Sequence, residues 1–293
     1  MHFPSRFVAV SVSIFLLLAL AWSNPAKAGE SYDNCAGFIT SLPATIVTPG
    51  TWCLNKNLST GLTAGNAIEI ATDDATIDCN GFKLAGTGGL ATKTRGINAS
   101  NRRNLTVRNC KIRGFYYGVQ FFGISGGGHV VDGNRIQDNT YHGLWIQGDG
   151  SVIRHNQVFH TGGSTIQAHA YGISTGYSVD VIDNTVSGVA ATAGSNGFAT
   201  GINSDISSAG TNISDNRVNR LVKDGAGLAR GIWNSSSDYI TVSGNHVVGT
   251  PNSANSIGLS CFNANGVAKD NVVSNFVVGI KGCTIADGNA VKN

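Results

Sequence analysis

Charge, and glutamate above all, is scarce in this 293-residue sequence. Glutamate occurs only at Glu30 and Glu69, and charged residues make up 13% of the chain, against a usual ~25%. Coiled coils and helical bundles need many glutamates and lysines, so the composition excludes both. The 41% of hydrophobic residues is too high for a disordered chain, and the glycines lack the strict period of three that collagen requires.

Proline is also rare, because only five occur and none lies between Pro49 and Pro251. Glycine is abundant instead, with 39 residues, roughly twice the usual share of ~7%. Proline cannot donate a backbone hydrogen bond within a sheet, so its absence suits a chain in which every strand pairs. The composition therefore predicts a β protein whose strands are separated by glycine turns.

The N-terminal segment reads as a secretory signal peptide over residues 1–28. Arg6 supplies the positive region, an apolar run covers 7–22, and Ala26-Lys27-Ala28 forms a small-residue cleavage site. The run is shorter than the ~20 residues that a membrane span needs, and no other stretch is long enough. We therefore expect a secreted or periplasmic protein whose mature chain lacks a membrane span and is nearly neutral.

A repeat of glycine followed by an aliphatic residue runs through the chain. Eight copies occur at intervals of 21 to 30 residues: Gly96-Ile97, Gly118-Val119, Gly143-Leu144, Gly172-Ile173, Gly201-Ile202, Gly231-Ile232, Gly258-Leu259 and Gly279-Ile280. Ala67-Ile68 looks like an earlier, weaker copy. One copy cannot bury its own apolar face, whereas stacked copies can, so the repeat predicts a solenoid with an inward aliphatic ladder. We expect the glycines to permit a tight bend where each strand begins.

A second column follows each glycine and reads aliphatic-x-x-Asn-x-aliphatic. Its asparagines are Asn80, Asn134, Asn156, Asn184, Asn216, Asn245, Asn271 and Asn289, while Cys110 takes this position in the second copy. If each copy makes one turn of ~4.8 Å, these side chains stack. Each amide should then bond its neighbour and the backbone of the turn.

These two columns resemble the repeats of right-handed parallel β-helix proteins of the pectate-lyase-like superfamily. The resemblance covers residues 67–293 and implies a single-stranded, right-handed all-β solenoid of about eight to nine coils. Residues 29–66 resemble the N-terminal cap of exported bacterial β-helix proteins, and a cap would cover the open end of the solenoid. The superfamily includes lyases, hydrolases, epimerases, adhesins and inert spikes, so the fold alone assigns no activity.

Six cysteines in an exported chain suggest disulfides. The repeat register places Cys79 near Cys110 and Cys261 near Cys283 in adjacent coils. Cys35 and Cys53 would then staple the cap. No C-x-x-C motif and no histidine cluster occurs, so we expect neither a metal nor a cofactor.

The connections between the asparagine column and the next glycine vary in length. They are short before Gly118 and Gly143 and longer from 157–171 onward, which predicts a low floor near 111–147 backed by a wall. Aromatic, amide and basic side chains gather there, and such groups stack on sugar rings and bond their hydroxyls. The candidate binding residues are Arg95, Tyr117, Gln120, Tyr141, His142, Trp145, His169, Tyr171 and Trp233. The alternative is that these aromatic rings only fill space beneath loops.

Basic residues are concentrated between Asp78 and Asp132, where no acid occurs. The eight bases are Lys83, Lys93, Arg95, Arg102, Arg103, Arg108, Lys111 and Arg113. Such a patch could attract an anionic polysaccharide, or it could be a solvated edge that blocks stacking of solenoids. We expect no nucleic-acid partner, because the mature chain is nearly neutral and carries no groove-reading motif.

The sequence carries no recognisable catalytic motif. His155, Asp183 and Asp215 occupy one column and could form a catalytic or cation-binding line, although Asp-Asn pairs are also favoured turn residues. The first hypothesis is therefore an exported carbohydrate-interacting protein. The alternatives are a polysaccharide lyase, epimerase or glycoside hydrolase with an unrecognised site, and a purely structural or protein-binding solenoid.

Overall fold

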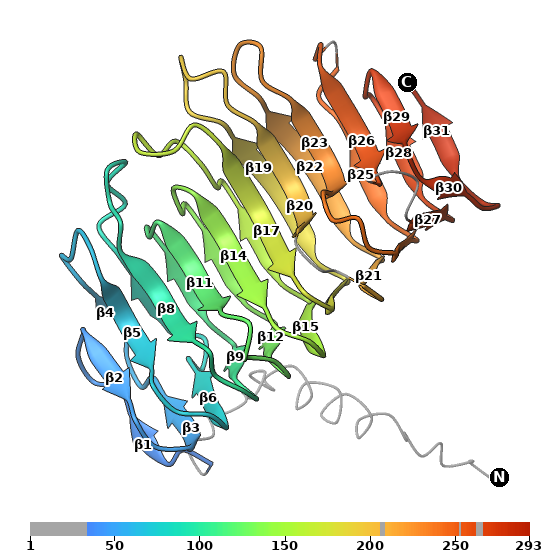
Figure 1. The fold of residues 1–293 in the computed structure, drawn as a ribbon. Coiled ribbons are helices and arrows are strands. Elements are labelled where there is room, and N and C mark those ends of the chain that lie inside the picture. The colour runs from blue at the N-terminus through green and yellow to red at the C-terminus, as the bar shows by residue number, and fades with distance from the viewer. Residues whose placement is uncertain (1–33, 206–208, 252, 262–265) are drawn as a thin grey trace, which may run out of the picture. The chain divides into compact units, whose positions relative to one another are not determined.

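The fold consists of three parallel sheets, which we name A, B and C. The computed structural model describes residues 34–293 except 206–208, 252 and 262–265, so the expected signal peptide lies outside the described residues. No helix occurs among the described residues. The chain visits the three sheets in turn, once per coil, which makes a right-handed parallel β-helix (Figure 1).

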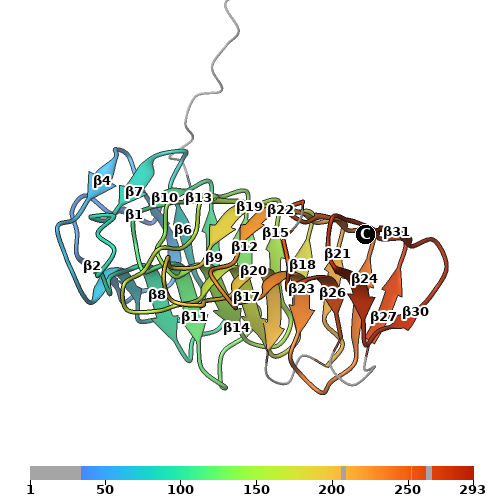
Figure 2. The same ribbon diagram turned by 90° about the horizontal axis from the view of Figure 1, so that it is seen from above.

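Sheet A has eleven strands: β1 (Gly37–Phe38), β3 (Gly50–Cys53), β6 (Ala75–Asp78), β9 (Thr106–Arg108), β12 (Val130–Asp132), β15 (Ser151–Arg154), β18 (Val179–Ile182), β21 (Asn212–Ser214), β24 (Ile240–Ser243), β27 (Gly266–Lys269) and β30 (Thr284–Ile285). Sheet B has ten: β2 (Ala44–Ile46), β5 (Asn66–Ile70), β8 (Arg95–Ser100), β11 (Tyr117–Phe122), β14 (His142–Gln147), β17 (Ala170–Gly176), β20 (Ala199–Asp205), β23 (Ala229–Asn234), β26 (Ser256–Ser260) and β29 (Val278–Lys281). Sheet C has ten: β4 (Leu58–Ser59), β7 (Lys83–Ala85), β10 (Lys111–Arg113), β13 (Arg135–Gln137), β16 (Gln157–Phe159), β19 (Thr185–Ala190), β22 (Arg217–Val222), β25 (His246–Val248), β28 (Val272–Ser274) and β31 (Ala290–Lys292). Figure 2 shows the three sheets from above.

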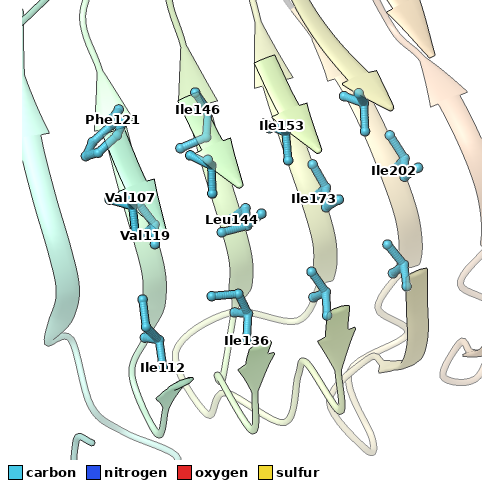
Figure 3. Packing of buried hydrophobic residues seen from close by; sticks show 14 of the residues in the cluster. Val107, Ile112, Val119, Phe121, Ile136, Leu144, Ile146, Ile153, Ile173 and Ile202 are labelled. Carbon is cyan, nitrogen blue, oxygen red and sulfur yellow. The ribbon is translucent and has the colours of Figure 1, made fainter. Parts of the chain in front are cut away.

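The predicted aliphatic ladder is confirmed and lies on the inner face of sheet B. Ile97 pairs with Val119, Val119 with Leu144, and Leu144 with Ile173, and the same register continues to Ile280. These side chains meet those of sheets A and C in one continuous core (Figure 3). Each coil therefore buries its apolar side chains against its two neighbours.

The reason predicted for the column glycines is wrong. None of the eight adopts a positive φ, so a left-handed bend does not require them. They stack so closely that a Cβ on Gly118 would lie 2.5 Å from the carbonyl oxygen of Gly143, and one on Gly143 would lie 2.6 Å from that of Gly172. The column needs glycine because neighbouring backbones approach each other.

The asparagine ladder lies at the turns between sheets A and C, and it is buried. The Asn184 side chain donates to Asn216 Oδ1 at 3.0 Å and to the carbonyl of Ile153 at 2.9 Å, while its oxygen accepts from the Asn156 backbone at 2.9 Å. The ladder runs from Asn134 to Asn289. Asn80 was predicted to join it, but its amide donates instead to the carbonyl of Leu54. The turn at 79–82 is longer, which moves Asn80 out of the column.

All three predicted cysteine pairs form disulfides. They join Cys35 to Cys53, Cys79 to Cys110, and Cys261 to Cys283. The second pair continues the line of the asparagine ladder, because the Cys110 backbone donates to Asn134 Oδ1 at 3.0 Å. In the region expected to be a cap, β1–β4 pair with the following coil, so they extend all three sheets.

Candidate functional site

The outer face of sheet B presents the residues that precede the column glycines. Tyr117 pairs with His142 on one side of the glycine, and Val119 pairs with Leu144 on the other. Val119 and Leu144 are fully buried in the core, so Trp145, the next residue, faces outward. The rings of Tyr117 and His142 lie 5.4 and 5.7 Å from that of Trp145, which places them on the same outer face.

Six rings on this face form what we call the aromatic cluster: Tyr116, Tyr117, Tyr141, His142, Trp145 and Tyr171. The His142 imidazole lies between two tyrosines, 5.2 Å from the Tyr117 ring and 4.6 Å from the Tyr171 ring, and stacks on both. Tyr141 contacts both His142 and Tyr171 edge-on. Each ring is held by its neighbours on adjacent strands, so the cluster is a preformed surface.

A second cluster lies beside it, toward the C-terminus. His169 stacks on Phe198 at 4.4 Å, and the Arg230 guanidinium lies 4.1 Å from the Phe198 ring and 4.0 Å from that of Trp233. Arginine between two aromatic faces gains from cation–π attraction. Arg230 shares a row with Tyr171 on sheet B, through Thr200 between them.

Unpartnered polar atoms are concentrated on this face. Eleven buried side-chain nitrogen and oxygen atoms in the described part of the chain have no hydrogen-bond partner. Seven of them belong to outward residues of sheet B: Arg95, Asn98, Gln120, His142, Ser174, Thr200 and Arg230. A buried polar atom without a partner costs ~1–3 kcal/mol, so this row departs from ordinary core packing.

Burial sets the ionisation of the cluster. His142 is 6% exposed, and burial lowers its pKa to about 3, so the imidazole is neutral at ordinary pH. Burial also raises the pKa values of Tyr117 and Tyr141, so both hydroxyls stay protonated. For His169, burial and then the charge of Arg230 lower the pKa. The face therefore offers neutral rings and hydroxyls, with arginines at its two ends and the carboxylates of Glu69 and Asp205 beside them.

The connections from sheet C to sheet B border this face. The short ones, 114–116 and 138–141, lead into β11 and β14, and the long ones, 86–94 and 160–169, lead into β8 and β17. The expected wall folds over the expected floor: Gly162 donates to the carbonyl of Asn139 at 2.8 Å, and Thr165 donates to that of Leu90 at 2.9 Å. The face is therefore closed along this edge rather than forming an open step.

Two cavities lie along the aromatic cluster and share Tyr117. The first, of about 140 Å³, is lined by Tyr117, Tyr141, His142, Trp145, Gln147, Tyr171, Ser174, Asn203 and Asp205. The second, of about 420 Å³, is lined by Ala64, Gly65, Lys93, Arg95, Tyr116, Tyr117, Ile166 and Gln167. Its volume is that of an ordinary small-molecule site, and its only charged lining residues are the cations Lys93 and Arg95.

The structure brings most of the predicted binding residues together. Tyr117, Tyr141, His142, Trp145 and Tyr171 form the core of the aromatic cluster. The others surround it: Gln120 pairs with Trp145, Arg95 lies over Tyr117 at 5.9 Å, and His169 and Trp233 belong to the second cluster.

The prediction missed several residues of this face. Asn98, Ser174, Thr200 and Arg230 occupy the same two rows as the predicted residues, one position before and two after the column glycines, so the repeat itself marks them although the candidate set left them out. Phe198 precedes its strand and belongs to no column, so no sequence signal marks it.

The structure bears on two sequence expectations about charge. The eight bases between Asp78 and Asp132 do not form one patch, because they are distributed over all three sheets and the intervening turns. His155, Asp183 and Asp215 do lie in one column, but each adopts a positive φ of 51–60° and serves as a turn residue. His155 Nδ1 lies 2.8 Å from Asp132 Oδ1, and no group of three histidine, cysteine or acidic side chains in the described residues could hold a metal ion.

The fold is similar to those of several solved structures. The family model described as "Right handed beta helix region" matches residues 56–169. The pectate lyase Pel9A structure has a TM-score of 0.54 at 12% identity, covering 83% of this chain and 70% of that one. The Dettilon tailspike has a TM-score of 0.51 at 15% identity, covering 87% of this chain and 60% of that one. The tailspike of E. coli bacteriophage HK620, in complex with a pentasaccharide, has a TM-score of 0.52 at 11% identity, covering 88% and 60%.

This chain folds as a right-handed parallel β-helix, the fold that the pectate lyase and tailspike structures share. It spans about 60% of the length of the tailspike chains it resembles. No curated protein matches the sequence. Within the described residues, no helix has the length and apolar character needed to cross a membrane.

Proposed function

We propose that the outer face of sheet B binds carbohydrate, with an acidic polysaccharide as the preferred ligand, and that the protein acts after export. The observation that carries this proposal is the aromatic cluster with its two cavities, which are lined by rings and by polar side chains. A sugar offers an apolar ring face for stacking on such rings, and its hydroxyls bond amide, hydroxyl and guanidinium groups.

The arginines favour an acidic ligand. Arg95 and Arg230 lie in one row on sheet B, separated by Tyr117, His142, Tyr171 and Thr200. Five strand spacings of ~4.8 Å put them ~24 Å apart. Each ends in a guanidinium group, which bonds a carboxylate well. A chain of several sugars lying across the strands would reach from one arginine to the other.

The electrostatics favour binding over turnover. A general acid or base works best when its pKa lies near the working pH. His142, with a pKa of about 3, is too weak a base, and Tyr117 and Tyr141 are too weak as acids. The groups suit hydrogen bonding to a ligand rather than proton transfer.

Export is supported by the three disulfides, which use every cysteine in the chain. Disulfides persist in oxidising compartments and are rare in the cytosol. We therefore place the protein in the periplasm or outside the cell.

The test is titration of the purified protein with a panel of uronate and neutral polysaccharides, followed by calorimetry. We expect one acidic polymer to bind and Trp145→Ala to weaken it at least tenfold, because ~1.4 kcal/mol of stacking is lost. Tyr239→Ala is the matched control, since this tyrosine is 57% exposed and lies in the turn between β23 and β24, outside the aromatic cluster.

Two results would contradict this proposal. If no polymer of the panel binds, the carbohydrate assignment is wrong. Unsaturated sugar detected by ultraviolet absorbance, or new reducing ends, would instead make the protein a lyase or a hydrolase. Epimerisation is checked by NMR of the recovered polymer.

A further inference from the structure

Sheet C differs from the other two sheets in charge. Its ten strands contain seven lysines and arginines and no aspartate or glutamate. The strands of sheet A contain three basic and three acidic residues. Those of sheet B contain three basic and two acidic residues. The chain is almost neutral overall, and its surplus of positive charge lies on sheet C.

The cations of sheet C lie in register on its outer face. Lys83 pairs with Lys111, and Lys111 pairs with Arg135, so three positive charges stand one strand spacing apart, ~4.8 Å. The row continues through Gln157 and Thr185 to Arg217 and then His246. Like charges on directly opposed residues destabilise a sheet. The row therefore has a cost that folding alone does not explain.

The cations of this row also lack acidic partners. In the described part of the chain, no carboxylate oxygen lies within 4.0 Å of the side-chain nitrogens of Lys83, Lys111 or Arg135. The three basic residues of the sheet A strands, by contrast, are all ion-paired. The Arg135 guanidinium bonds Gln137 and Gln157 and lies 4.9 Å from the Phe159 ring.

A cavity of about 670 Å³ opens on the same face. Its lining includes Phe159, Thr185, Ser187, Arg217, Arg220 and His246, and no acidic residue. Arg220 follows Asn219 at a corner that is left-handed in most coils, so its φ of 54° belongs to the repeat; the equivalent residues are Gly114, Asp138, His160, Gly188 and Asn275.

We propose that the outer face of sheet C is a second binding surface, for a linear anionic polysaccharide that lies across the strands. The row from Lys83 to His246 spans six strand spacings, ~29 Å, which suits a polymer with regularly repeated acidic groups. Gln157 and Thr185, between the cations, would bond sugar hydroxyls. A single-stranded nucleic acid fits less well, because such ligands need successive aromatic platforms. Phe159 is the only phenyl, tyrosyl or indolyl ring in the sheet C strands, and Arg135 already covers it.

This surface is independent of the face on sheet B, so it is tested where binding at that face has been weakened. Polygalacturonate is titrated into the full mature chain carrying Trp145→Ala, with neutral dextran as the comparison probe. The test variant adds Lys83→Gln, Lys111→Gln and Arg135→Gln. The matched control adds Arg108→Gln, Arg154→Gln and Lys269→Gln, which remove the same formal charge from sheet A. A second test variant adds Arg217→Gln and Arg220→Gln.

We expect polygalacturonate, and not dextran, to bind the Trp145→Ala protein with an affinity that falls steeply with salt. The sheet C triple variant should lose at least tenfold in affinity, and the control less than twofold. The melting temperature of the sheet C triple variant should equal or exceed that of its parent, because three mutually repelling charges are gone. If the sheet C triple variant does not fold, the variant with Arg217→Gln and Arg220→Gln is measured instead, and it should also lose at least tenfold in affinity.

Three results would overturn the proposal. The sheet C variants could bind as tightly as their parent, which would leave sheet B as the sole site. Both triple variants could lose affinity equally, which would reduce the effect to net charge. A single-stranded oligonucleotide could bind more tightly than polygalacturonate, which would assign the surface to another class of polymer.

Discussion

Two buried histidines predict that this protein loses stability in mild acid. His142 is 6% exposed, and burial lowers its pKa to about 3. His129 is 2% exposed, and burial lowers its pKa to about 4, with the charge of Asp73 opposing the shift. The His129 ring also accepts a hydrogen bond from the backbone of Leu105 at 3.3 Å, which requires an unprotonated Nδ1.

The sign of the effect follows from where protons bind. An unfolded histidine titrates near 6.5 and takes up a proton below that pH, whereas both folded histidines stay neutral. Their contribution to stability is therefore complete above pH ~6.5 and is lost as the pH falls toward the folded pKa values. At pH 5, ~1.5 pH units below the unfolded pKa, proton binding stabilises the unfolded chain by about 2 kcal/mol at each of the two histidines. The sum of about 4 kcal/mol corresponds to a fall of roughly 10 °C in the melting temperature.

The assay is thermal unfolding followed by circular dichroism at pH 7.5, 6 and 5, with matched histidine variants. His142→Phe keeps an aromatic ring in the stack and should remove about half of the pH dependence. His160→Gln is the control, because the side chain of His160 is 70% exposed, and it should leave the dependence unchanged. A melting temperature that is constant or rises between pH 7.5 and 5, or an equal slope in His142→Phe and the wild type, would refute the reasoning.

Three further predictions concern the scaffold. Asn184→Ala should destabilise the protein by ~3–5 kcal/mol in denaturant titration, since it leaves a buried backbone N–H and carbonyl unpartnered, whereas Asn289→Ala, at the end of the ladder, should cost clearly less. Gly143→Ala should lower the melting temperature and weaken ligand binding, because its Cβ would lie 2.5 Å from the side chain of Val158; equal behaviour to wild type would contradict the stacked-backbone account. Intact mass after alkylation without reduction should show no modified thiol, and reduction should then lower the melting temperature.

Periodicity made the core of this fold predictable. The repeated pair that includes Gly118-Val119 recurs often enough to set the register, and that register placed Leu144 beside Ile173 and Cys79 beside Cys110. Each coil solves the same packing problem as the last, so one pattern fixes many contacts at once.

The candidate site was only partly predictable because it depends on departures from the repeat. Whether Tyr117 faces inward or outward depends on the backbone beside Gly118, and alternation alone does not reveal it. The contact between Thr165 and Leu90 joins loops from different coils, and no local sequence pattern predicts it. The charge of sheet C emerges only once each lysine is assigned to a face.

Because each coil adds one strand to each sheet, the number of coils sets the length of both outer faces. Gain or loss of a whole coil of 21 to 30 residues would preserve the register of all the remaining coils. Such a change would lengthen or shorten both outer faces by ~4.8 Å, about the width of a single strand. Duplication within the gene could thus match the reach of this protein to longer polymers without redesigning its core.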